Sequence, residues 1–402
     1  MRLFIAALFL FLPVSAFCAE SVFVLANKNV KESADLAAQY CALRGIGQEN
    51  LILLDVKNAP NISRADYRLR VASPVFETLK ARGMFSASGV YPKVSVFANR
   101  AKYVVLCKGL PYRILEDAPA GAPKPDAHSN NSACLDSELA LLLEGDYSLS
   151  NFRLNKSFKA GVYSPMLNQL IVARLDGITY ADALNLVKSA IYAEQNGLRG
   201  RVYIDKSKKY PAGDEWLSAA EKILSDKGFD ITTDEKPACM DYFFRFDAPV
   251  FYLGWYASSP VYYFKSDLVK FAPGASALHI YSFAASNLAS KKTWAPNLVS
   301  HAPAAAFGYT DEPFLIGTHR PDIYVAALAS GKTAGESAFL AMFAFSWKGM
   351  FLGDPLYRPF SVPLERQLKF IEGGKVDGFS QYAVIRAMNL ASDSSEAVQI
   401  GL

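Results

Sequence analysis

The sequence predicts an α/β protein made of two βα halves with mainly parallel sheets, followed by a small C-terminal appendage. Short apolar runs rich in β-branched residues alternate with helical patterns, as in βαβ units. Several of these runs are apolar throughout, as strands covered on both faces are. The alternation occurs twice, and we place the halves at residues 20–185 and 186–364, with a more polar tail at 365–402.

Residues 1–19 have the order of a secretory signal peptide. Arg2 precedes an apolar run, Pro13 ends that run, and small residues follow. The run is too short to span a bilayer, which takes about 20 apolar residues. We therefore expect an exported protein, periplasmic or extracellular, with no transmembrane segment after the signal is removed. Cleavage after Ala16, or at Cys18 or Ala19, is left open.

The first half begins with a strand at 21–26. Ser33 is a cap for the helix that follows it, and Gly45 is a natural end for that helix. The remaining elements of this half are strands at 51–56 and 103–107, helices at 63–82 and 134–143, and a loop at 116–133 rich in proline, alanine, glycine and asparagine.

A helix from Thr179, its N-cap, to Gly197, its C-cap, is expected across the boundary between the two halves. Asp214 is expected to cap a later helix. The other expected elements are strands at 201–205, 229–232, 250–253, 277–282 and 304–309, and helices at 321–330 and 334–347.

Composition limits the possible functions. Lys and Arg number 42 against 38 Asp and Glu, a net charge of +4, so bulk charge gives no reason to expect nucleic-acid binding. Hydrophobic residues make up 51% of the 402 residues, enough for a real core. The four histidines show no zinc spacing and the glycines form no phosphate loop, so we expect no metal and no cofactor. Oligomeric state and the disulfide state are left open, the latter for Cys41, Cys107, Cys134 and Cys239.

Active sites in open α/β sheets lie at the carboxyl ends of strands, and polar or aromatic residues follow several of the expected strands here. Lys108, Arg113, Gly254, Trp255 and Tyr256 are candidate binding residues. The candidate catalytic residues are Ser282, Glu312 and Asp354. Carboxylates at such positions suit proton transfer or a hard cation, although Gly-Asp-Pro-Leu is also ordinary turn chemistry for Asp354.

Other charged residues have a structural interpretation beside a functional one. Asp136 and Glu138 stand in a first helical turn, where carboxylates complement the dipole, or they face Lys108 or Arg113 across a cleft. Arg174 and Asp176 are expected to pair and to fix a turn at Gly177.

Six strings together resemble an uncharacterised family of exported bacterial proteins: RLDG at 174–177, CLDSEL at 134–139, KGLPYR at 108–113, YLGWYA at 252–257, DEP at 311–313 and GDPLYRPF at 353–360. More distantly, the second half resembles the caspase-type fold of gingipain-like cysteine peptidases. Those peptidases have a catalytic histidine after one strand and a catalytic cysteine after the next.

The matching positions here lie near Gly254-Trp255 and near Ser282-Phe283-Ala284, and they hold neither histidine nor cysteine. His279, three residues before Ser282, points to the opposite face of an extended strand. Peptidase chemistry of this kind needs a thiolate beside a base. The resemblance therefore implies a fold and a cleft, and it argues against that reaction.

Three functions remain. The first is a non-peptidase member of the caspase-like fold, a pseudoenzyme that binds a peptide or another cell-envelope ligand in its cleft. The second is a hydrolase that uses Ser282, or Cys134 with His128 as base, or a carboxylate pair acting through water. The third is a structural protein of the envelope. Whether the protein is an enzyme, and which partner it binds, the sequence leaves open.

Overall fold

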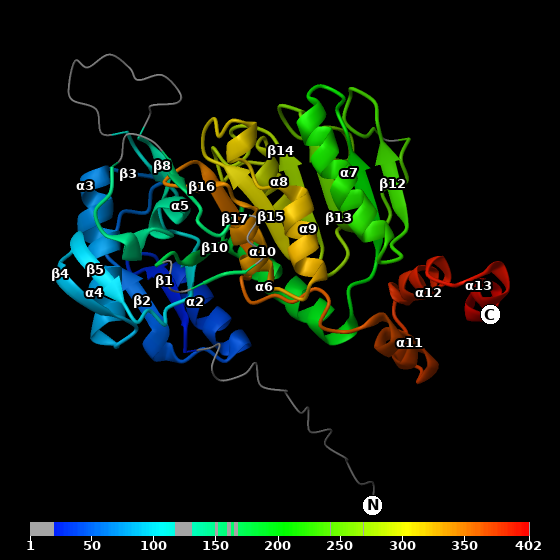
Figure 1. Cartoon of the computed structure of the whole chain (residues 1–402), viewed down its shortest axis with the longest axis horizontal. Helices are drawn as coiled ribbons and strands as arrows, with labels where there is room; N and C mark the ends of the chain where they lie inside the picture. The colour runs from blue at the N-terminus through cyan, green and yellow to red at the C-terminus, as the bar shows by residue number, and fades with distance from the viewer. Residues whose placement is uncertain are drawn as a thin grey trace, which may run out of the picture.

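The computed structural model describes residues 20–116, 131–148, 152–158, 162–164, 168–241, 243–267 and 269–401. The expected signal peptide therefore lies outside the described residues. The structure confirms the α/β class: one large, mostly parallel sheet lies between helices (Figure 1). Its strands are β1 (Val22–Asn27), β2 (Leu51–Leu54), β6 (Tyr103–Cys107), β10 (Ile171–Leu175), β11 (Arg201–Asp205), β12 (Ile231–Asp234), β13 (Pro249–Trp255), β14 (Ser276–Ile280), β15 (Ala305–Tyr309) and β17 (Gly349–Gly353).

The sheet consists of two parallel sets of five strands that run in opposite directions. The strand order is β12-β11-β13-β14-β15-β17-β10-β6-β1-β2. The two sets meet where β15 pairs with β17 in antiparallel register, from Ala305 opposite Gly353 to Tyr309 opposite Gly349. Each set has the same internal order, so the sheet has a pseudo-two-fold axis between β15 and β17. The second half of the chain supplies β17 to the set that the first half builds.

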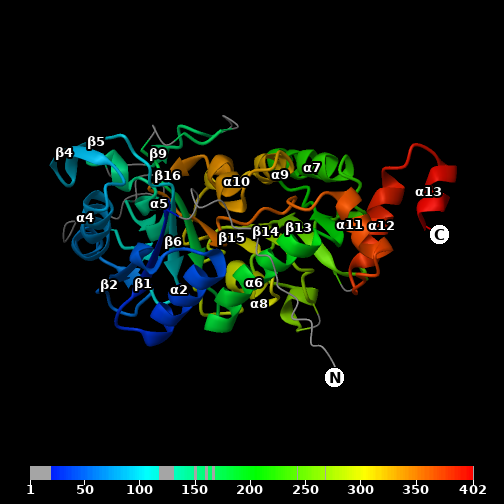
Figure 2. The same ribbon diagram turned by 90° about the horizontal axis from the view of Figure 1, so that it is seen from below.

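Helices cover both faces of the sheet (Figure 2). One face packs against α2 (Lys31–Arg44), α6 (Tyr180–Asn196) and α8 (Trp294–Ser300). The other face carries α4 (Ser73–Ala81), α5 (Leu135–Leu139), α7 (Pro211–Ser225), α9 (Pro321–Ala329) and α10 (Ala334–Ala341). Both faces of the central strands are buried, which is why most residues of these strands are apolar.

Small elements surround the first set of strands. They are the sheet of β3 (Asn61–Ile62), β7 (Arg113–Ile114) and β8 (Ala133–Cys134), the hairpin of β4 (Ser86–Val90) and β5 (Lys93–Phe97), the pair of β9 (Arg153–Leu154) and β16 (Ala344–Phe345), and helix α3 (Arg64–Tyr67).

Several helix boundaries differ from the sequence prediction, and the helix expected at 134–143 ends at Leu139. The helix expected at 334–347 ends at Ala341, because β16 pairs with β9 and tertiary pairing overrides the local helical pattern. Ser33 does not cap α2, since its hydroxyl accepts the Asn27 N–H instead. Asp214 does not cap α7, because that helix already begins at Pro211, whose fixed φ suits a first turn. The expected cap Thr179 is confirmed.

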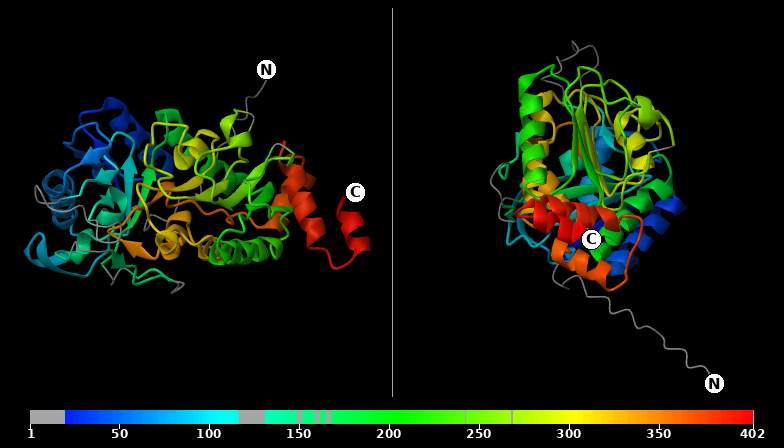
Figure 3. Two further views of the ribbon diagram at one scale, coloured as in Figure 1. Left: turned by 90° about the horizontal axis from the view of Figure 1, so that it is seen from above. Right: turned by 90° about the vertical axis from the view of Figure 1, so that its right-hand side faces the viewer.

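The C-terminal tail forms α11 (Leu364–Glu372), α12 (Ser380–Asn389) and α13 (Ser394–Gly401), drawn in red at one end of the molecule (Figure 3). Asp377 anchors it by accepting from the Arg199 guanidinium at 2.7 and 2.8 Å and from the Tyr192 hydroxyl at 2.6 Å. The Arg386 guanidinium lies 4.2 Å from the Phe229 ring centroid. Within the described ranges, no helix is long and apolar enough to cross a membrane.

Candidate functional site

A groove of about 640 Å³ opens where β13, β14 and β15 end. Because β13 and β14 are parallel neighbours, with Trp255 beside Ile280, their carboxyl ends reach the same edge of the sheet. The groove brings together four of the residues predicted as binding or catalytic, namely Trp255, Tyr256, Ser282 and Glu312. Most of its lining is apolar and aromatic, which is typical of a ligand pocket with a few placed polar groups.

Three non-glycine residues of the groove have a left-handed backbone. They are Tyr256 with φ 80°, Phe283 with φ 62° and Phe314 with φ 55°, and one of them follows each of the three strands. Such conformations are unfavourable for L-residues, and a bulky side chain makes them rarer still. They persist only where the surrounding structure fixes them, and they concentrate at functional sites.

Trp255 is a fixed wall of the groove. Its side chain is buried, and its indole Nε1 donates to Asp214 Oδ1 at 2.8 Å. Tyr256 is half-buried and stands among other rings, with the centroid of Tyr210 at 5.4 Å and that of Tyr281 at 5.8 Å. Hydrogen bonding to Tyr256 raises the pKa of the Tyr210 hydroxyl. The two tyrosines therefore form one aromatic surface against the fixed indole.

Ser282 and Glu312 are the polar candidates in the groove. Both are half-buried, and no hydrogen bond of the Ser282 hydroxyl is found among the described residues. The Glu312 carboxylate accepts the Phe314 N–H at 2.9 Å, which orients the side chain along its own turn. The Phe283 N–H donates to the Asp311 carbonyl at 3.2 Å, so the loops after β14 and β15 hold each other in place.

A buried polar chain lies beneath the groove, on the opposite face of the sheet. The Ala257 N–H donates to His279 Nε2 at 3.1 Å, so that nitrogen is unprotonated. The neutral ring then carries its proton on Nδ1 and donates it to the Tyr252 hydroxyl at 2.9 Å. Tyr252 in turn donates to Asp205 Oδ2 at 3.3 Å. The chain ends on a carboxylate, where the Cys239 thiol also donates, at 2.8 Å.

Burial sets the protonation states in this chain. Desolvation lowers the pKa of His279 to about 3, and its ring stacks on Trp294 at a centroid distance of 3.7 Å. Desolvation raises the pKa of Asp205 to about 6, against the opposing effect of the Cys239 and Met240 hydrogen bonds. Burial, with Asp205 as the second cause, also raises the pKa of the Cys239 thiol. Cys239 is thus held as a neutral donor and not as a thiolate.

Sequence analysis did not find this chain, because it depends on strand register. Asp205, Gly254 and His279 are side by side across β11, β13 and β14. The predicted binding residue Gly254 belongs here and not to the groove lining. A Cβ on it would lie 2.7 Å from the Tyr252 hydroxyl and 2.9 Å from the Asp205 Cβ, so glycine leaves room for both.

Lys108 and Arg113 lie outside the groove lining. The Lys108 ammonium donates to the Gly177 carbonyl at 2.6 Å and to Asp176 at 3.2 Å. Arg113 donates to the carbonyls of Ser286 at 3.1 Å and Thr310 at 2.8 Å, and so links the two halves of the chain.

Asp354 and Glu312 lie at opposite ends of the central strands. Asp354 follows β17, which runs against β15, so it is beside the start of β15 and not its end. The side chain is fully buried, pairs with Arg44, and accepts from the Tyr40 hydroxyl at 2.9 Å. Its Oδ1 also accepts the Leu356 N–H at 3.0 Å, the turn chemistry that its sequence suggested.

The remaining charged candidates are paired inside the core. Asp136 accepts from Arg174 at 2.6 Å, and Glu138 pairs with Arg64, so neither faces Lys108 or Arg113. Asp176 lies 3.5 Å from the Arg174 guanidinium and accepts the Gly177 N–H at 2.8 Å, which confirms the predicted turn.

The four described cysteines are free thiols. Cys134 is fully buried, and desolvation raises its pKa well above the ordinary value. Its proposed base, His128, lies outside the described residues. Among the residues that the structure describes, no cluster of three or more histidines, cysteines and carboxylates is arranged to hold a metal ion.

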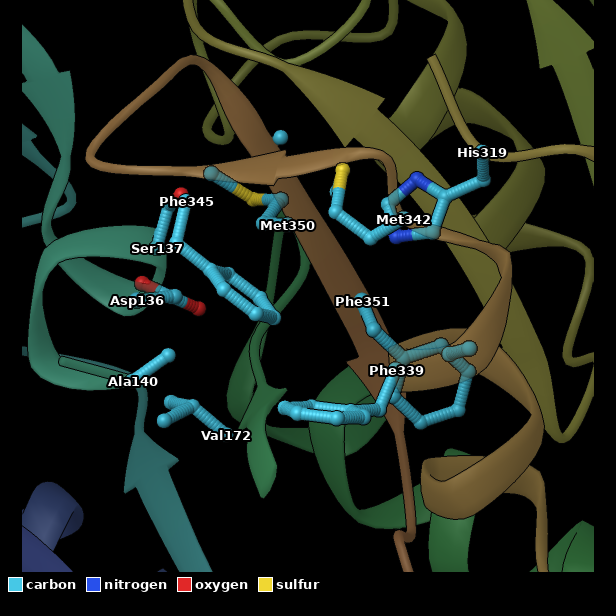
Figure 4. A pocket seen from close by; sticks show the side chains of 12 residues that line it. Asp136, Ser137, Ala140, Val172, His319, Phe339, Met342, Phe345, Met350 and Phe351 are labelled. Atoms are coloured by element: carbon cyan, nitrogen blue, oxygen red, sulfur yellow. The ribbon is translucent and has the colours of Figure 1, made fainter. Parts of the chain in front are cut away.

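A second, smaller cavity of about 30 Å³ lies between β10, β17 and α10. Figure 4 shows His319 and Met342 together on one side of it, with Asp136 and Ser137 across from them. Desolvation lowers the pKa of His319 to about 3, and the Asp136 carboxylate is already engaged by Arg174. The space suits a water molecule, not an organic ligand.

Comparison with known proteins adds little to this geometry. No family model matches the chain, and no curated protein matches its sequence. Among solved structures, one described as "Structure of Protease" aligns over 85% of this chain and 78% of its own, with a TM-score of 0.46 and 8% sequence identity. At that score, the likeness carries no argument about activity.

Proposed function

We propose that this chain is a ligand-binding member of the caspase and gingipain-like fold that lacks the peptidase pair, and that its groove binds a peptide or another ligand of the cell envelope. The observation that carries this proposal is the groove itself. It lies where two adjacent parallel strands end, and residues in left-handed backbone conformations project from three neighbouring loops. The site positions expected from the peptidase resemblance, near Trp255 and Ser282, fall in this groove.

The chemistry of the described thiols favours binding over cysteine peptidase activity. A peptidase thiol must ionise beside a base. Cys41, Cys107 and Cys134 are buried, and burial raises the pKa of each. The neutral Cys239 thiol donates a hydrogen bond to Asp205 on the far face of the sheet from the groove. In the described part of the chain, no cysteine or histidine lines the groove.

A peptide fits the lining better than a strongly polar ligand does. Rings and aliphatic side chains make up most of the groove, and they suit apolar side chains of a peptide. Ser282 and Glu312 then supply a hydroxyl and a carboxylate for the peptide backbone. Exposed aromatic residues such as Phe283, which is 46% exposed, are frequent anchors of binding energy.

The test is binding of residues 20–402 to a library of fluorescent peptides, followed by anisotropy titrations of the best binders. Phe283→Ala should weaken binding by about tenfold or more, since an aromatic anchor contributes roughly 2 kcal/mol. The matched control is Phe243→Ala, because Phe243 is 95% exposed and lies outside the groove lining. Equal affinity of the Phe283 variant and the wild type contradicts a binding role for the groove.

The same peptides separate the alternatives when the products are analysed by mass spectrometry. Cleavage that disappears in Ser282→Ala establishes the hydrolase function and rejects the proposal. If no peptide binds and no tested ligand raises the melting temperature, the structural function is favoured instead.

A further inference from the structure

An ammonium group of the protein itself lies over the ring of Tyr256, one of the aromatic residues that line the groove. The Lys209 Nζ lies 4.0 Å from the centroid of the Tyr256 ring. Throughout the described ranges, no carboxylate pairs with Lys209, whereas its neighbour Lys208 pairs with Glu235 at 3.3 Å. The cation is therefore placed by the ring and not by an anion. A cation over a ring face is attracted by the negative electrostatic potential of that face.

Three further rings surround Tyr256. The Tyr210, Trp255 and Tyr281 centroids lie 5.4, 5.6 and 5.8 Å from it, in edge-on arrangements. None of these three rings is stacked face to face on Tyr256, and the Lys209 ammonium lies over that ring. The left-handed backbone of Tyr256 and the buried indole of Trp255 fix this arrangement in advance.

We propose that this box, formed by Tyr210, Trp255, Tyr256 and Tyr281, binds a quaternary ammonium group of the ligand, and that Lys209 occupies the Tyr256 face until the ligand displaces it. This inference rests on the proposed binding function of the groove, whose ligand class it narrows.

A quaternary group fits this box better than a primary amine. A primary ammonium carries three N–H donors that need acceptors once water is removed. Apart from the tyrosine and threonine hydroxyls, the side chains of the described lining offer these donors only the Ser282 hydroxyl and the Glu312 carboxylate, one oxygen of which already accepts the Phe314 N–H. A trimethylammonium group has no N–H to satisfy and is attracted by the ring faces alone. Glu312 adds a favourable negative charge at longer range.

The decisive probes are choline and its neutral isostere 3,3-dimethyl-1-butanol, which has the same shape without the charge. Isothermal titration of residues 20–402 should show choline binding at least about fivefold tighter than the isostere, within the range of a cation–ring attraction. Equal affinities for the two probes overturn the inference, because they indicate simple apolar binding.

Two variants test the role of individual residues. Lys209→Ala should strengthen choline binding between about twofold and thirtyfold, because the competing internal cation is removed. Lys208→Ala, the matched control, should leave the affinity unchanged. Tyr256→Leu should weaken choline binding at least threefold, and Tyr281→Leu repeats that test if the first variant does not fold. Unchanged choline affinity in Lys209→Ala overturns the inference.

The peptide library separates failure of this inference from failure of the proposed function. Peptide binding without choline binding overturns the ammonium site alone, and the absence of both overturns the site and the proposed function together. Sedimentation with phosphatidylcholine vesicles, against phosphatidylglycerol vesicles as control, identifies the source of the group. Sedimentation that choline reverses supports a lipid headgroup, and choline binding without sedimentation supports a free ligand.

Discussion

The buried carboxyl of Asp205 gives the protein an unusual dependence on pH. Its pKa is about 6 in the folded chain, above the ordinary value of 3.8, so folding favours the protonated form. Stability from this group is complete below about pH 4 and is lost as the pH rises through 6, by roughly 3 kcal/mol. Asp205→Asn should remove this loss.

The measurement is urea unfolding of both proteins between pH 4 and 7. The stability of the wild type relative to Asp205→Asn should fall steadily as the pH rises. His279 and His319 produce the opposite trend, since their lowered pKa costs stability in acid, and both histidines are present in each of the two proteins. A difference that does not vary with pH would show that Asp205 titrates normally.

Asp354 tests whether a residue first considered catalytic is structural. It is fully buried against Arg44 and Tyr40. Asp354→Asn removes one of the two carboxylates that pair with Arg44, the other being Glu194 at 2.6 Å, so the cost should reach at most the roughly 3–5 kcal/mol of a buried pair that loses its partner. We expect a correspondingly lower unfolding free energy with ligand binding unchanged below the melting transition. Glu365→Gln, an exposed partner of Lys369, is the control and should be neutral.

Cys134 tests the thiol hydrolase alternative. Because the side chain is fully buried and its pKa is raised, native protein at pH 8 should not react there with iodoacetamide. Labelling should appear only after denaturation, as peptide mapping by mass spectrometry would show. Rapid labelling of native Cys134 would restore it as a candidate nucleophile.

Sequence reasoning located part of the site correctly in space. Trp255, Tyr256, Ser282 and Glu312 each follow a strand, and the rule about carboxyl ends was enough to bring them together. The same rule misplaced Asp354, because β17 runs in the direction opposite to β15 and the sequence carries no local mark of strand direction.

At the scale of single elements, the N-terminus of helix α10 is stabilised by a capping box. The Thr333 hydroxyl accepts the Glu336 N–H at 3.1 Å, and the Glu336 carboxylate accepts the Thr333 N–H at 2.9 Å. Thr333→Ala should reduce the unfolding free energy by about 1 kcal/mol, measured by urea titration. The control is Thr78→Ala. The Thr78 hydroxyl donates only to the Pro74 carbonyl of its own helix, so this variant should change the unfolding free energy little. Equal effects of the two variants would contradict the capping role.

Element boundaries were predictable where the signal is local. Thr179 marks the start of α6 because its cap involves neighbours within three residues. The end of α10 was not predictable, since residues 342–347 are held by β9 and by a bridge between Met342 and His319. Those partners are distant in sequence, so the apolar run alone indicates a longer helix.

At the scale of the whole molecule, the continuous sheet predicts that both halves unfold together. A chain ending at residue 363 lacks α11–α13 and the Arg199–Asp377 pair, and it should fold with a lower melting temperature. A chain ending at 343 also lacks β17, which pairs with both β15 and β10, and it should lose the protection of both halves in hydrogen exchange. Independent survival of either half in the shorter chain would contradict this coupling.

The class of fold was predictable from alternating strands and helices, whereas the reversal between the two sets of strands was not. Periodicity reports whether a strand is buried, and it does not report which neighbour it pairs with. Strands β15 and β17 pair in antiparallel register, and neither strand's sequence indicates its partner or its direction.

The central position of β17 also has a consequence for protein synthesis. The set of β2, β1, β6 and β10 leaves the ribosome long before residues 349–353, which complete it. Domains generally fold in order from the amino terminus during translation, but this set of strands keeps an unpaired inner edge at β10 until β17, the last strand of the sheet in the sequence, has been made. The first set of strands therefore cannot be completed until β17 has been synthesised. A chaperone that shields the open edge of β10 would act before that point.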